Sequence, residues 1–488
     1  NLDDATGTVA FAAGGNLSAN ATPQALDYGS YGSAVNFDLS DGSGATTGIG
    51  GTWSGVTSVA GSAAGDTIAG SNQTYTLTGA NAGNNGTVSW TAFENIADSG
   101  IGTLNAANQA WALTGHNQGT VTDLSGAFSG IGNLLDTGSG SFLMHSGADG
   151  DISGNLDAGT GGSIDYTGYT TAVNVNLSGT GTSGVGGTAS GIASITASSN
   201  LGVSGGTAGS LGIITTGAGT TATLGTLSTG TNLTINASGA VLQSGAVTVT
   251  GITTVNAGSN AITLTDSGND FGGTVNLTGG TTQITDQNAL TLGTLSTGAL
   301  TATSTGTLNL GHGSVGGTLS ATSNNGTITE GSGGVQVSGT SNLQAGSGAI
   351  TLADAGNHFA GAVTAAGQGV SLVDAGNLTI ASLSSGTNGA VNLTAGGSLT
   401  LPALGIDTGT ASLTLAANGG ALVMPGALSG ANVTLIGRDG ITLGSNLTSA
   451  GTVTLTSNAG AISQTGGVVT AGTLTGSSAS TTTLGSAN

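Results

Sequence analysis

The chain of 488 residues has no cysteine, no lysine and a single arginine, Arg438. Without cysteine, backbone pairing and apolar burial must stabilise the fold unaided, and such a composition suits an exported protein. The 22 acidic residues give a formal net charge of −21, so no basic surface is available for nucleic-acid phosphates, and anionic membranes should repel the chain. No apolar run approaches the roughly 18 residues that span a bilayer. We therefore expect neither a nucleic-acid partner nor membrane insertion.

Proline (three residues), charged residues (5%) and aromatic residues (3%) are also scarce, whereas glycine supplies 96 residues. This glycine content lacks the G-X-Y period of collagen, which excludes a collagen helix. Glycine-rich and serine-rich chains are often disordered. Here, however, Val, Ile, Leu and Thr recur at regular spacing, which favours an ordered chain.

The clearest periodicity lies in the last third of the chain. The triplets Leu413-Thr414-Leu415, Val433-Thr434-Leu435 and Val453-Thr454-Leu455 begin 20 residues apart, and similar triplets continue towards the N-terminus at steps of 18 to 22 residues. In a strand, each triplet places two aliphatic side chains on one face and a polar one on the other. Gly, Asn, Ser and Asp, which favour turns, separate the triplets.

A unit of about 20 residues buries too little apolar surface to fold alone, so this period indicates stacked units that share one core. A leucine-rich repeat would need helix-forming residues where this sequence has Gly, Thr and Ser. Short strands joined by Gly and Asn turns are typical of an all-β parallel β-helix, or β-solenoid. At ~4.8 Å per coil, roughly 24 coils would form an elongated rod of about 115 Å.

One segment of this pattern occurs twice. A-I-T-L-T-D-S-G-N-D-F-G-G (261–273) returns 88 residues later as A-I-T-L-A-D-A-G-N-H-F-A-G (349–361). Because 88 residues is about four coils, we expect Phe271 and Phe359 to be equivalent positions that pack at a corner rather than bind a ligand. Glu330 stands where other triplets have Leu, so either the register slips there or Glu330 faces a turn.

The composition changes near residue 200, without an obvious linker. Residues 1–200 are richer in aromatic residues and Asp, whereas residues 201–488 form a regular region rich in Gly, Thr and Asn. The first region has its own echo, since Q-T-Y-T-L-T-G at Gln73 is similar to Q-A-W-A-L-T-G at Gln109. We predict a β-helical region in 1–200 and β-helical shaft repeats in 201–488.

The block A-I-T-L-T-D-S-G-N-D-F-G-G-T-V-N-L and the motif L-D-Y...Y-G-S-A-V-N-F-D-L resemble repeats of filamentous haemagglutinin-type adhesins. The resemblance implies a right-handed β-helix from a two-partner-secretion exoprotein, which acts in attachment or in a biofilm matrix. The N-P-N-G secretion motif of such proteins does not occur in this sequence. We therefore expect the chain to be a piece of the shaft.

Few residues point to chemistry. β-Helical enzymes that cleave acidic sugars need basic residues, and here only Arg438 is present, in a G-R-D-G turn. A hydrolase needs two carboxylates roughly 5 to 10 Å apart, and no sequence cluster indicates a pair. The four His are far apart in the sequence, so we expect no enzyme and no zinc site. Calcium is the remaining cofactor to consider, with Asp66, Asp266 and Asp270 as weak candidate ligands; turn formation is the simpler role for each.

The sequence thus predicts a non-catalytic, extracellular structural or adhesive rod of a secreted bacterial adhesin or biofilm-matrix protein. Polysaccharide or a host or neighbouring cell surface would be its partner. A second hypothesis is a filament subunit that self-associates head to tail. A third, minor one is a β-helix that binds or cleaves polysaccharide. Exposed Trp or Tyr of the N-terminal region could stack on sugar rings, although core packing is the simpler role for these side chains.

Overall fold

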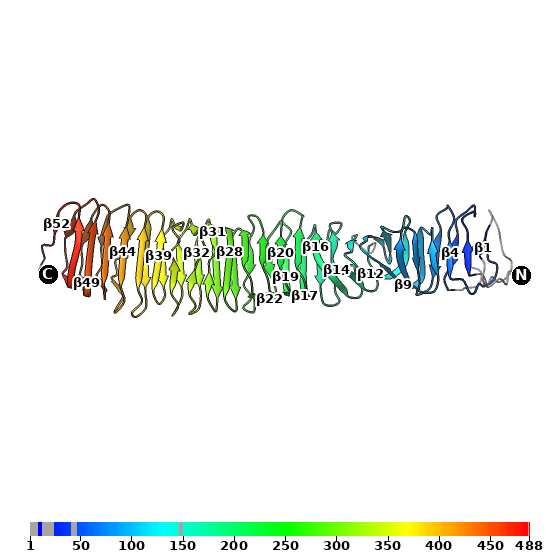
Figure 1. The fold of residues 1–488 in the computed structure, drawn as a ribbon, viewed down its shortest axis with the longest axis horizontal. Coiled ribbons are helices and arrows are strands. Elements are labelled where there is room, and N and C mark those ends of the chain that lie inside the picture. Colours follow the sequence, from blue (N-terminus) through cyan, green and yellow to red (C-terminus); the bar gives the residue numbers. More distant parts are fainter. Residues whose placement is uncertain (1–7, 12–23, 41–45, 146–149, 487) are drawn as a thin grey trace. The chain divides into compact units, whose positions relative to one another are not determined.

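The computed structural model describes residues 8–11, 24–40, 46–145, 150–486 and 488. Within these ranges the protein is all-β, without a helix, and forms a parallel β-solenoid as predicted. Among the described residues there is no helical segment that could span a membrane. The chain divides into two compact units, residues 1–230 with 236–238 (unit 1) and residues 231–235 with 239–488 (unit 2). Figure 1 shows the stacked strands of each unit.

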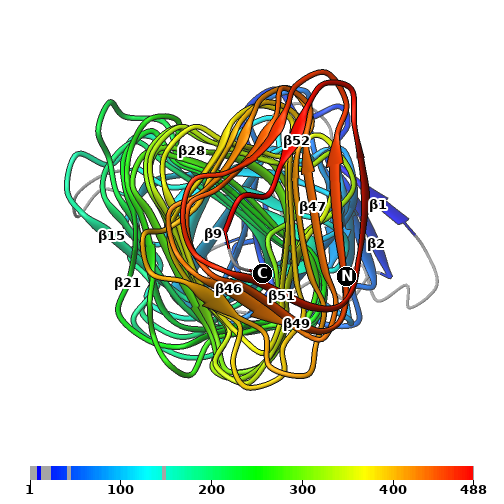
Figure 2. The ribbon, with the colours of Figure 1, turned by 90° about the vertical axis from the view of Figure 1, so that its left-hand side faces the viewer.

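In unit 2, each coil carries up to three short strands, and strands of successive coils pair in parallel to form columns along the stack. Figure 2 looks along this stack from its C-terminal strands. The first column consists of β28 (Leu290–Thr297), β30 (Leu308–Asn309), β33 (Ile328–Thr329), β36 (Ile350–Leu352), β39 (Val370–Asp374), β41 (Val391–Ala395), β44 (Leu413–Ala417), β47 (Val433–Gly437), β49 (Leu447–Ser457) and β51 (Val469–Ser478).

The other two columns are built in the same way. The second consists of β21 (Val241–Gln243), β24 (Ile262–Leu264), β27 (Thr282–Asp286), β29 (Leu300–Ser304), β32 (Leu319–Thr322), β35 (Ser341–Gln344), β38 (Val363–Ala366) and the second half of β40 (Leu378–Ser384), and later β43 (Ile406–Asp407), β46 (Leu428–Gly430) and the first halves of β49 and β51. The third includes β23 (Thr253–Asn256), β26 (Val275–Gly279), the second half of β28, β31 (His312–Val315), β34 (Val335–Val337) and β37 (His358–Phe359), and later the first half of β40, β42 (Leu399–Thr400), β45 (Leu422–Met424), β48 (Ile441–Leu443), β50 (Ile462–Gln464) and β52 (Thr482–Thr483). The remaining strands are β20 (Leu233–Asn236), at the boundary between the units, and the paired β22 (Val247–Val249) and β25 (Asp270–Phe271).

The predicted register is present in the first column. Leu413 pairs with Val433, and Val433 pairs with Val453, so each step is 20 residues. The alternate residues Leu415, Leu435 and Leu455 follow the same register, and all six aliphatic side chains are buried. The Thr between each pair faces outward and is half-buried. The core of unit 2 is therefore a continuous aliphatic ladder, one level per coil.

The 88-residue repeat does not return to the same face of the coil. Ile262 begins the first copy in the second column, where four successive pairings lead to Ser341. The second copy begins nine residues later, at Ile350, which pairs with Ile328 in the first column. The repeat is thus four coils plus one face, so Phe271 and Phe359 occupy equivalent places in the repeat but different sides of the coil.

Unit 1 contains β1 to β19, which pair mostly in parallel. They are β1 (Thr8–Ala10), β2 (Ala25–Asp27), β3 (Asn36–Asp38), β4 (Ser58–Ala60), β5 (Thr67–Gly70), β6 (Thr74–Gly79), β7 (Ala82–Asn84), β8 (Ser89–Thr91), β9 (Asn95–Ala106), β10 (Ala110–Gly115), β11 (Gln118–Val121), β12 (Phe128–Asp136), β13 (Ser141–Leu143), β14 (Leu156–Tyr166), β15 (Val173–Asn176), β16 (Ala189–Ala197), β17 (Leu201–Thr207), β18 (Leu211–Thr215) and β19 (Ala222–Thr229).

Many coils of unit 1 are longer than the predicted average. Ala25 pairs with Ser58, and Thr67 pairs with Asn95, steps of 33 and 28 residues. Two coils contain antiparallel excursions, β6–β7–β8 and β10–β11–β12. In both, an Asn with positive φ forms the turn: Asn81 (52°) in the first and Asn117 (56°) in the second. Asn tolerates this backbone conformation better than most residues. The echo between the segments at Gln73 and Gln109 is the sequence of these two hairpins.

The boundary predicted near residue 200 rests on a change in composition. The two units of the structure are instead defined by the contacts within each of them. The units meet in the sequence at residues 230–239. A boundary near residue 200 stays a prediction.

Candidate functional site

The repeated segment holds its coil corner together with buried polar side chains. Asn269 is fully buried, and its Oδ1 accepts the main-chain N–H of Val247 from the preceding coil (2.8 Å). Asp286 is also fully buried, and its Oδ2 accepts the N–H of Phe271 (2.7 Å). The Phe271 ring lies in the core. The corner thus satisfies buried main-chain donors that have no strand partner.

The second copy reproduces each contact. Val335 donates its N–H to Asn357 Oδ1 (2.8 Å), and Phe359 donates to Asp374 Oδ2 (2.6 Å). Asn357, Phe359 and Asp374 are all buried. Because the same polar set recurs at both copies, the residues G-N-x-F are retained to close a corner, which requires no ligand.

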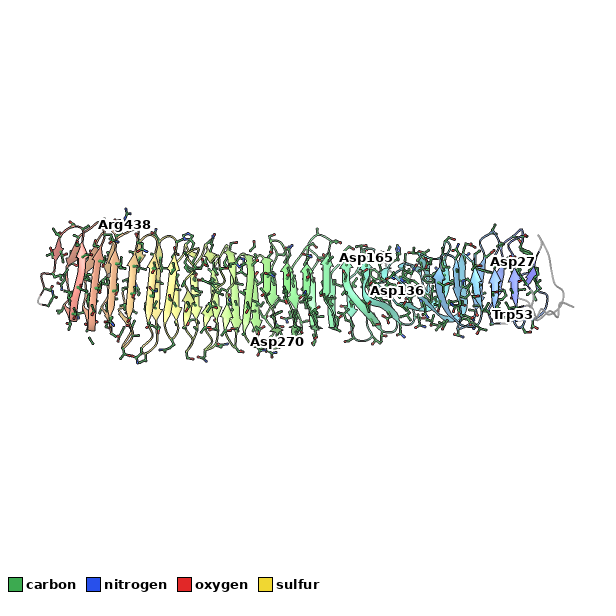
Figure 3. All side chains as sticks on the ribbon, viewed as in Figure 1. Asp27, Trp53, Asp136, Asp165, Asp270 and Arg438 are labelled. Atoms are coloured by element: carbon green, nitrogen blue, oxygen red, sulfur yellow. The ribbon has the colours of Figure 1, made fainter. Side chains whose placement is uncertain are left out.

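Unit 1 uses the same device with other partners. Asp98 accepts the N–H groups of Asn72 and Gln73 (2.8 and 2.9 Å) and the Tyr75 hydroxyl (3.0 Å). Asp136, labelled in Figure 3, accepts the corresponding N–H groups of Asn108 and Gln109 (2.8 and 2.9 Å) and the Trp111 indole N–H (3.1 Å). Each carboxylate therefore anchors the start of one hairpin to the next coil.

The three calcium candidates lie in different settings. Asp66 is completely buried, and its carboxylate accepts the N–H groups of Val35 (2.7 Å) and Ser62 as well as the Ser62 hydroxyl (2.8 Å). A cation there would have to displace these donors. Asp266 is half-buried, and its Oδ1 accepts the N–H of Gly268 (2.8 Å). Asp270 is half-buried as well. In the described part of the chain, no three acidic or His side chains come together as a metal site.

Glu330 faces a turn, and the register around it does not slip. Ile328 keeps its pairing with Leu308 and Ile350, while Glu330 Oε1 accepts the N–H of Asp354 in the turn of the next coil (2.6 Å). Burial, the largest influence, raises the pKa of Glu330. Its Oε2 and the Nδ2 of Asn357 are both buried and make no hydrogen bond of normal geometry within the described residues.

Gln243 takes the place of Glu330 at the corner of the first copy. Its Oε1 accepts the N–H of Asp266 (3.1 Å) and Nδ2–H of Asn269 (3.2 Å), and its Nε2–H donates to Asn269 Oδ1. An amide therefore satisfies this corner fully, whereas the ionised carboxylate of Glu330 cannot donate a proton.

The basic side chains are isolated. Arg438 is 58% exposed in its turn, and its Nε lies 4.0 Å from Asp439 Oδ1; Figure 3 shows it at the surface. His116 Nδ1 lies 2.7 Å from Asp151 Oδ1, and His358 Nδ1 lies 3.4 Å from Asp374 Oδ1. His116 and His358 therefore each pair with one carboxylate.

The large aromatic side chains of unit 1 pack in its core. Trp53, Trp90 and Trp111 are 7%, 1% and 2% exposed, respectively. Trp111 stacks on Phe142 with ring centroids 5.4 Å apart. These indoles are not available to stack on a sugar ring at the surface.

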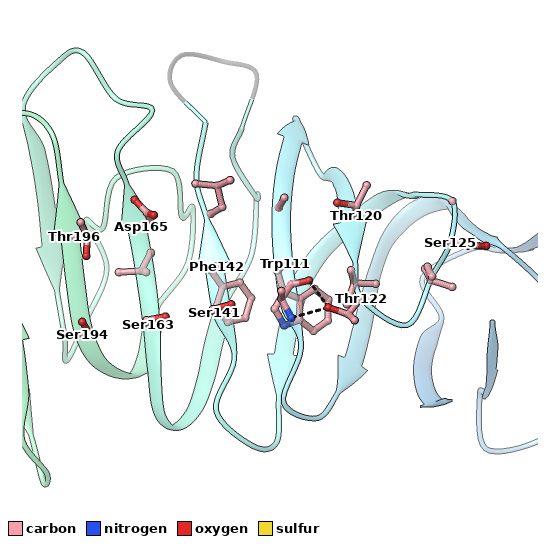
Figure 4. A pocket seen from close by; sticks show the side chains of 17 residues that line it. Trp111, Thr120, Thr122, Ser125, Ser141, Phe142, Ser163, Asp165, Ser194 and Thr196 are labelled. Atoms are coloured by element: carbon pink, nitrogen blue, oxygen red, sulfur yellow. Dashed lines mark hydrogen bonds between the residues drawn. The ribbon is translucent and has the colours of Figure 1, made fainter. Parts of the chain in front are cut away.

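A groove of about 700 Å³ lies on the outward face of unit 1 (Figure 4). Its floor comes from β10, β13, β14 and β16, which pair in register so that Ala110, Ser141, Ser163 and Ser194 form one row across the strands. The segment that follows β11 lies at one end and contributes Thr122, whose Oγ1 accepts the N–H of Ala110 (3.1 Å). No sequence signal indicates this groove, because outward Ala and Ser are typical of any solvent-exposed strand position.

Comparison with known proteins identifies two segments of the chain that are similar to a described family of repeats. Residues 208–278 and 297–366 match a family described as repeats of unknown function (DUF5649), and these segments begin 89 residues apart. Each contains one copy of the corner with Phe271 or Phe359. No curated protein and no solved structure matched the chain. Together with the paired strands, the match shows that this chain is a β-solenoid repeat protein, with segments similar to that family of repeats.

Proposed function

We propose that the chain is a non-catalytic structural segment of a secreted bacterial surface or biofilm-matrix protein, similar to filamentous haemagglutinin-type adhesins. The observation that carries this proposal is the unbroken pairing of Val391, Leu413, Val433 and Val453, residue by residue, in four successive coils. These side chains are at most 1% exposed. Such a ladder leaves no room for a ligand in the core, so the coils serve as a scaffold.

The physical role of such a stack is stiffness. Each coil is joined to the next by rows of main-chain hydrogen bonds and by aliphatic contacts, so bending the stack would strain many of them together. The net charge of −21 keeps the surface soluble and discourages non-specific association with other acidic surfaces. A stiff, soluble, cysteine-free segment suits a spacer outside the cell.

The surface chemistry supports a non-catalytic role. Arg438 is the one cationic side chain with a fixed charge in the sequence, and it lies exposed beside Asp439. The buried carboxylates Asp136, Asp286 and Asp374 are occupied by main-chain donors. Carboxylates that anchor the backbone in this way are poorly placed to act as an acid or base on a substrate.

The localisation is tested with antibodies raised against the purified chain. On intact cells of the source organism, we expect labelling without permeabilisation, and we expect the antigen in the culture medium or the matrix fraction. A control antibody against a cytosolic protein should label only permeabilised cells. Labelling that requires permeabilisation would overturn the extracellular proposal.

Self-association is a second candidate, favoured by apolar exposure on β51. Leu474 pairs with Val453 in the aliphatic ladder, but it is 44% exposed, whereas Val453 is fully buried. A further coil would cover this surface, whether the chain itself continues into one or a second copy of the chain supplies it, since open strand edges template pairing. Sedimentation of the chain at rising concentration tests this: single chains throughout would exclude it, and assembly that Leu474→Asp abolishes would support it.

A further inference from the structure

The groove on unit 1 is hollow because its floor carries small side chains. Ala110, Ser141, Ser163 and Ser194 occupy four neighbouring strands, and two residues along each strand lie Ala112, Leu143, Asp165 and Thr196. Most outward strand positions elsewhere also carry Thr, Asn or Ser, but here the turn after β11 adds Leu124, Ser125 and Gly126 to the lining. Figure 4 shows Ser125 at one end of the row of strands. The small side chains of the floor and the turn at its end together give a groove and not a flat sheet.

The floor presents a row of free hydroxyls. Neighbouring strands lie about 4.8 Å apart, so Ser141, Ser163 and Ser194 offer hydroxyls at that spacing. Within the described residues, these three hydroxyls make no hydrogen bond to the protein. Each can donate one hydrogen bond and accept two. Asp165 lies on the same floor, and one of its carboxylate oxygens already accepts the N–H of Thr167 (2.7 Å).

The chemistry of the groove selects among ligand classes. Anionic ligands are disfavoured, because Asp165 is in the groove and no basic side chain lines it. A peptide that adds to a sheet needs a strand edge, whereas this groove lies on a sheet face. Apolar ligands would leave the row of serine hydroxyls unpaired. A chain of neutral sugars offers hydroxyls that both donate and accept, at a spacing of the same order as the strands, and its ring C–H faces suit the half-buried Leu143.

We propose that this groove binds a neutral oligosaccharide or polysaccharide chain, with its sugar hydroxyls bonded to the row Ser141, Ser163 and Ser194 and to Asp165. The volume of about 700 Å³ is within the range of small-molecule sites and holds a few sugar units. Binding would be weak at one groove, because exposed hydroxyl contacts compete with water. This proposal concerns a ligand site, and it stands or falls independently of the scaffold role proposed above.

The test is isothermal titration calorimetry of the whole 488-residue chain with cellohexaose, maltohexaose and N-acetylchitohexaose, and with hexagalacturonate as the acidic comparison. We expect at least one neutral hexasaccharide to bind and hexagalacturonate not to bind. The triple variant Ser141→Ala, Ser163→Ala, Ser194→Ala should weaken that binding by about tenfold or more, because it removes three hydrogen-bonding groups. Ser163→Trp, which fills the groove, should abolish it.

Thr301→Trp is the matched control, because Thr301 is an exposed outward position on β29 of unit 2. It should leave binding unchanged, and circular dichroism with thermal unfolding should show that all variants keep the native fold. Absence of binding by all three neutral hexasaccharides, or binding that the triple variant and Ser163→Trp leave unchanged, would overturn the proposal. Preferential binding of hexagalacturonate would also overturn it.

Discussion

Phe271 donates its main-chain N–H to Oδ2 of Asp286, 15 residues later, over 2.7 Å. Asp286 also accepts the N–H of Asn288 through Oδ1 (2.6 Å), so one buried carboxylate satisfies two donors. Asp286→Ala would leave the buried N–H of Phe271 without a partner and should destabilise this part of unit 2 by about 1–3 kcal/mol, whereas the exposed Asn288 can bond to water instead. Hydrogen exchange at the Phe271 amide measures the effect locally, which matters because repeat proteins often unfold in parts.

Asp270→Ala is the control for this change, since Asp270 lies beside Phe271 but is half-buried. It should alter exchange at Phe271 by no more than about 0.5 kcal/mol, as is usual for surface substitutions. If both variants accelerate exchange equally, the carboxylate of Asp286 is not what holds the corner.

Glu330→Gln should stabilise unit 2 at neutral pH. Burial raises the pKa of Glu330 from 4.5. The folded state therefore holds this proton more tightly than the unfolded state, and the stability it provides is fully present below pH 4.5 and is lost as the pH rises through the raised pKa. Gln at this position would reproduce the contacts of Gln243 and remove that loss.

Urea unfolding of the wild type and of Glu330→Gln at pH 4 and pH 7 checks this expectation. The variant should gain more over the wild type at pH 7 than at pH 4. Asp439→Asn, at an exposed turn position, should show no such difference. An equal gain at both pH values would mean that ionisation of Glu330 is not responsible.

Leu435→Ala should create a cavity in the aliphatic ladder. Leu435 is fully buried between Leu415 and Leu455, so we expect a loss of about 2–5 kcal/mol. Thr434→Ala removes a neighbouring outward side chain and should cost far less. Hydrogen exchange across β44, β47 and β49 would localise the damage, and similar protection in both variants would contradict the proposed ladder.

Trypsin should cut the chain at Arg438 alone, because the sequence has no other Arg and no Lys. The denatured chain should therefore give two fragments, which mass spectrometry would identify as residues 1–438 and 439–488. In the native protein, we expect slower cleavage, since the main-chain N–H of Arg438 donates to Ala417 O (3.0 Å) and its carbonyl accepts the N–H of Ala459 (2.6 Å). Native cleavage as fast as that of the denatured chain would show that this turn opens freely.

The sequence predicted the ladder because its aliphatic triplets repeat at nearly constant steps, and paired strands in a solenoid must keep that register. It did not reveal the hairpins at Asn81 and Asn117, since Asn and Gly mark a hairpin turn and a coil corner alike. Nor did it show that Asp98, Asp136 and Asp286 are buried, because an Asp close to Gly in the sequence usually indicates a solvent-exposed turn. Burial of those carboxylates depends on donors from neighbouring coils, which lie 15 to 28 residues away in the sequence.

The offset of the 88-residue repeat bears on how such a protein can grow by duplication. Each copy ends one face further around a three-sided coil, so a newly added copy would point its loops in a different direction from its parent. About three duplications would bring a given loop back to its original orientation. A gene that lengthens by this unit therefore distributes the same surface feature around the axis, and a large binding partner could reach some copy from any side.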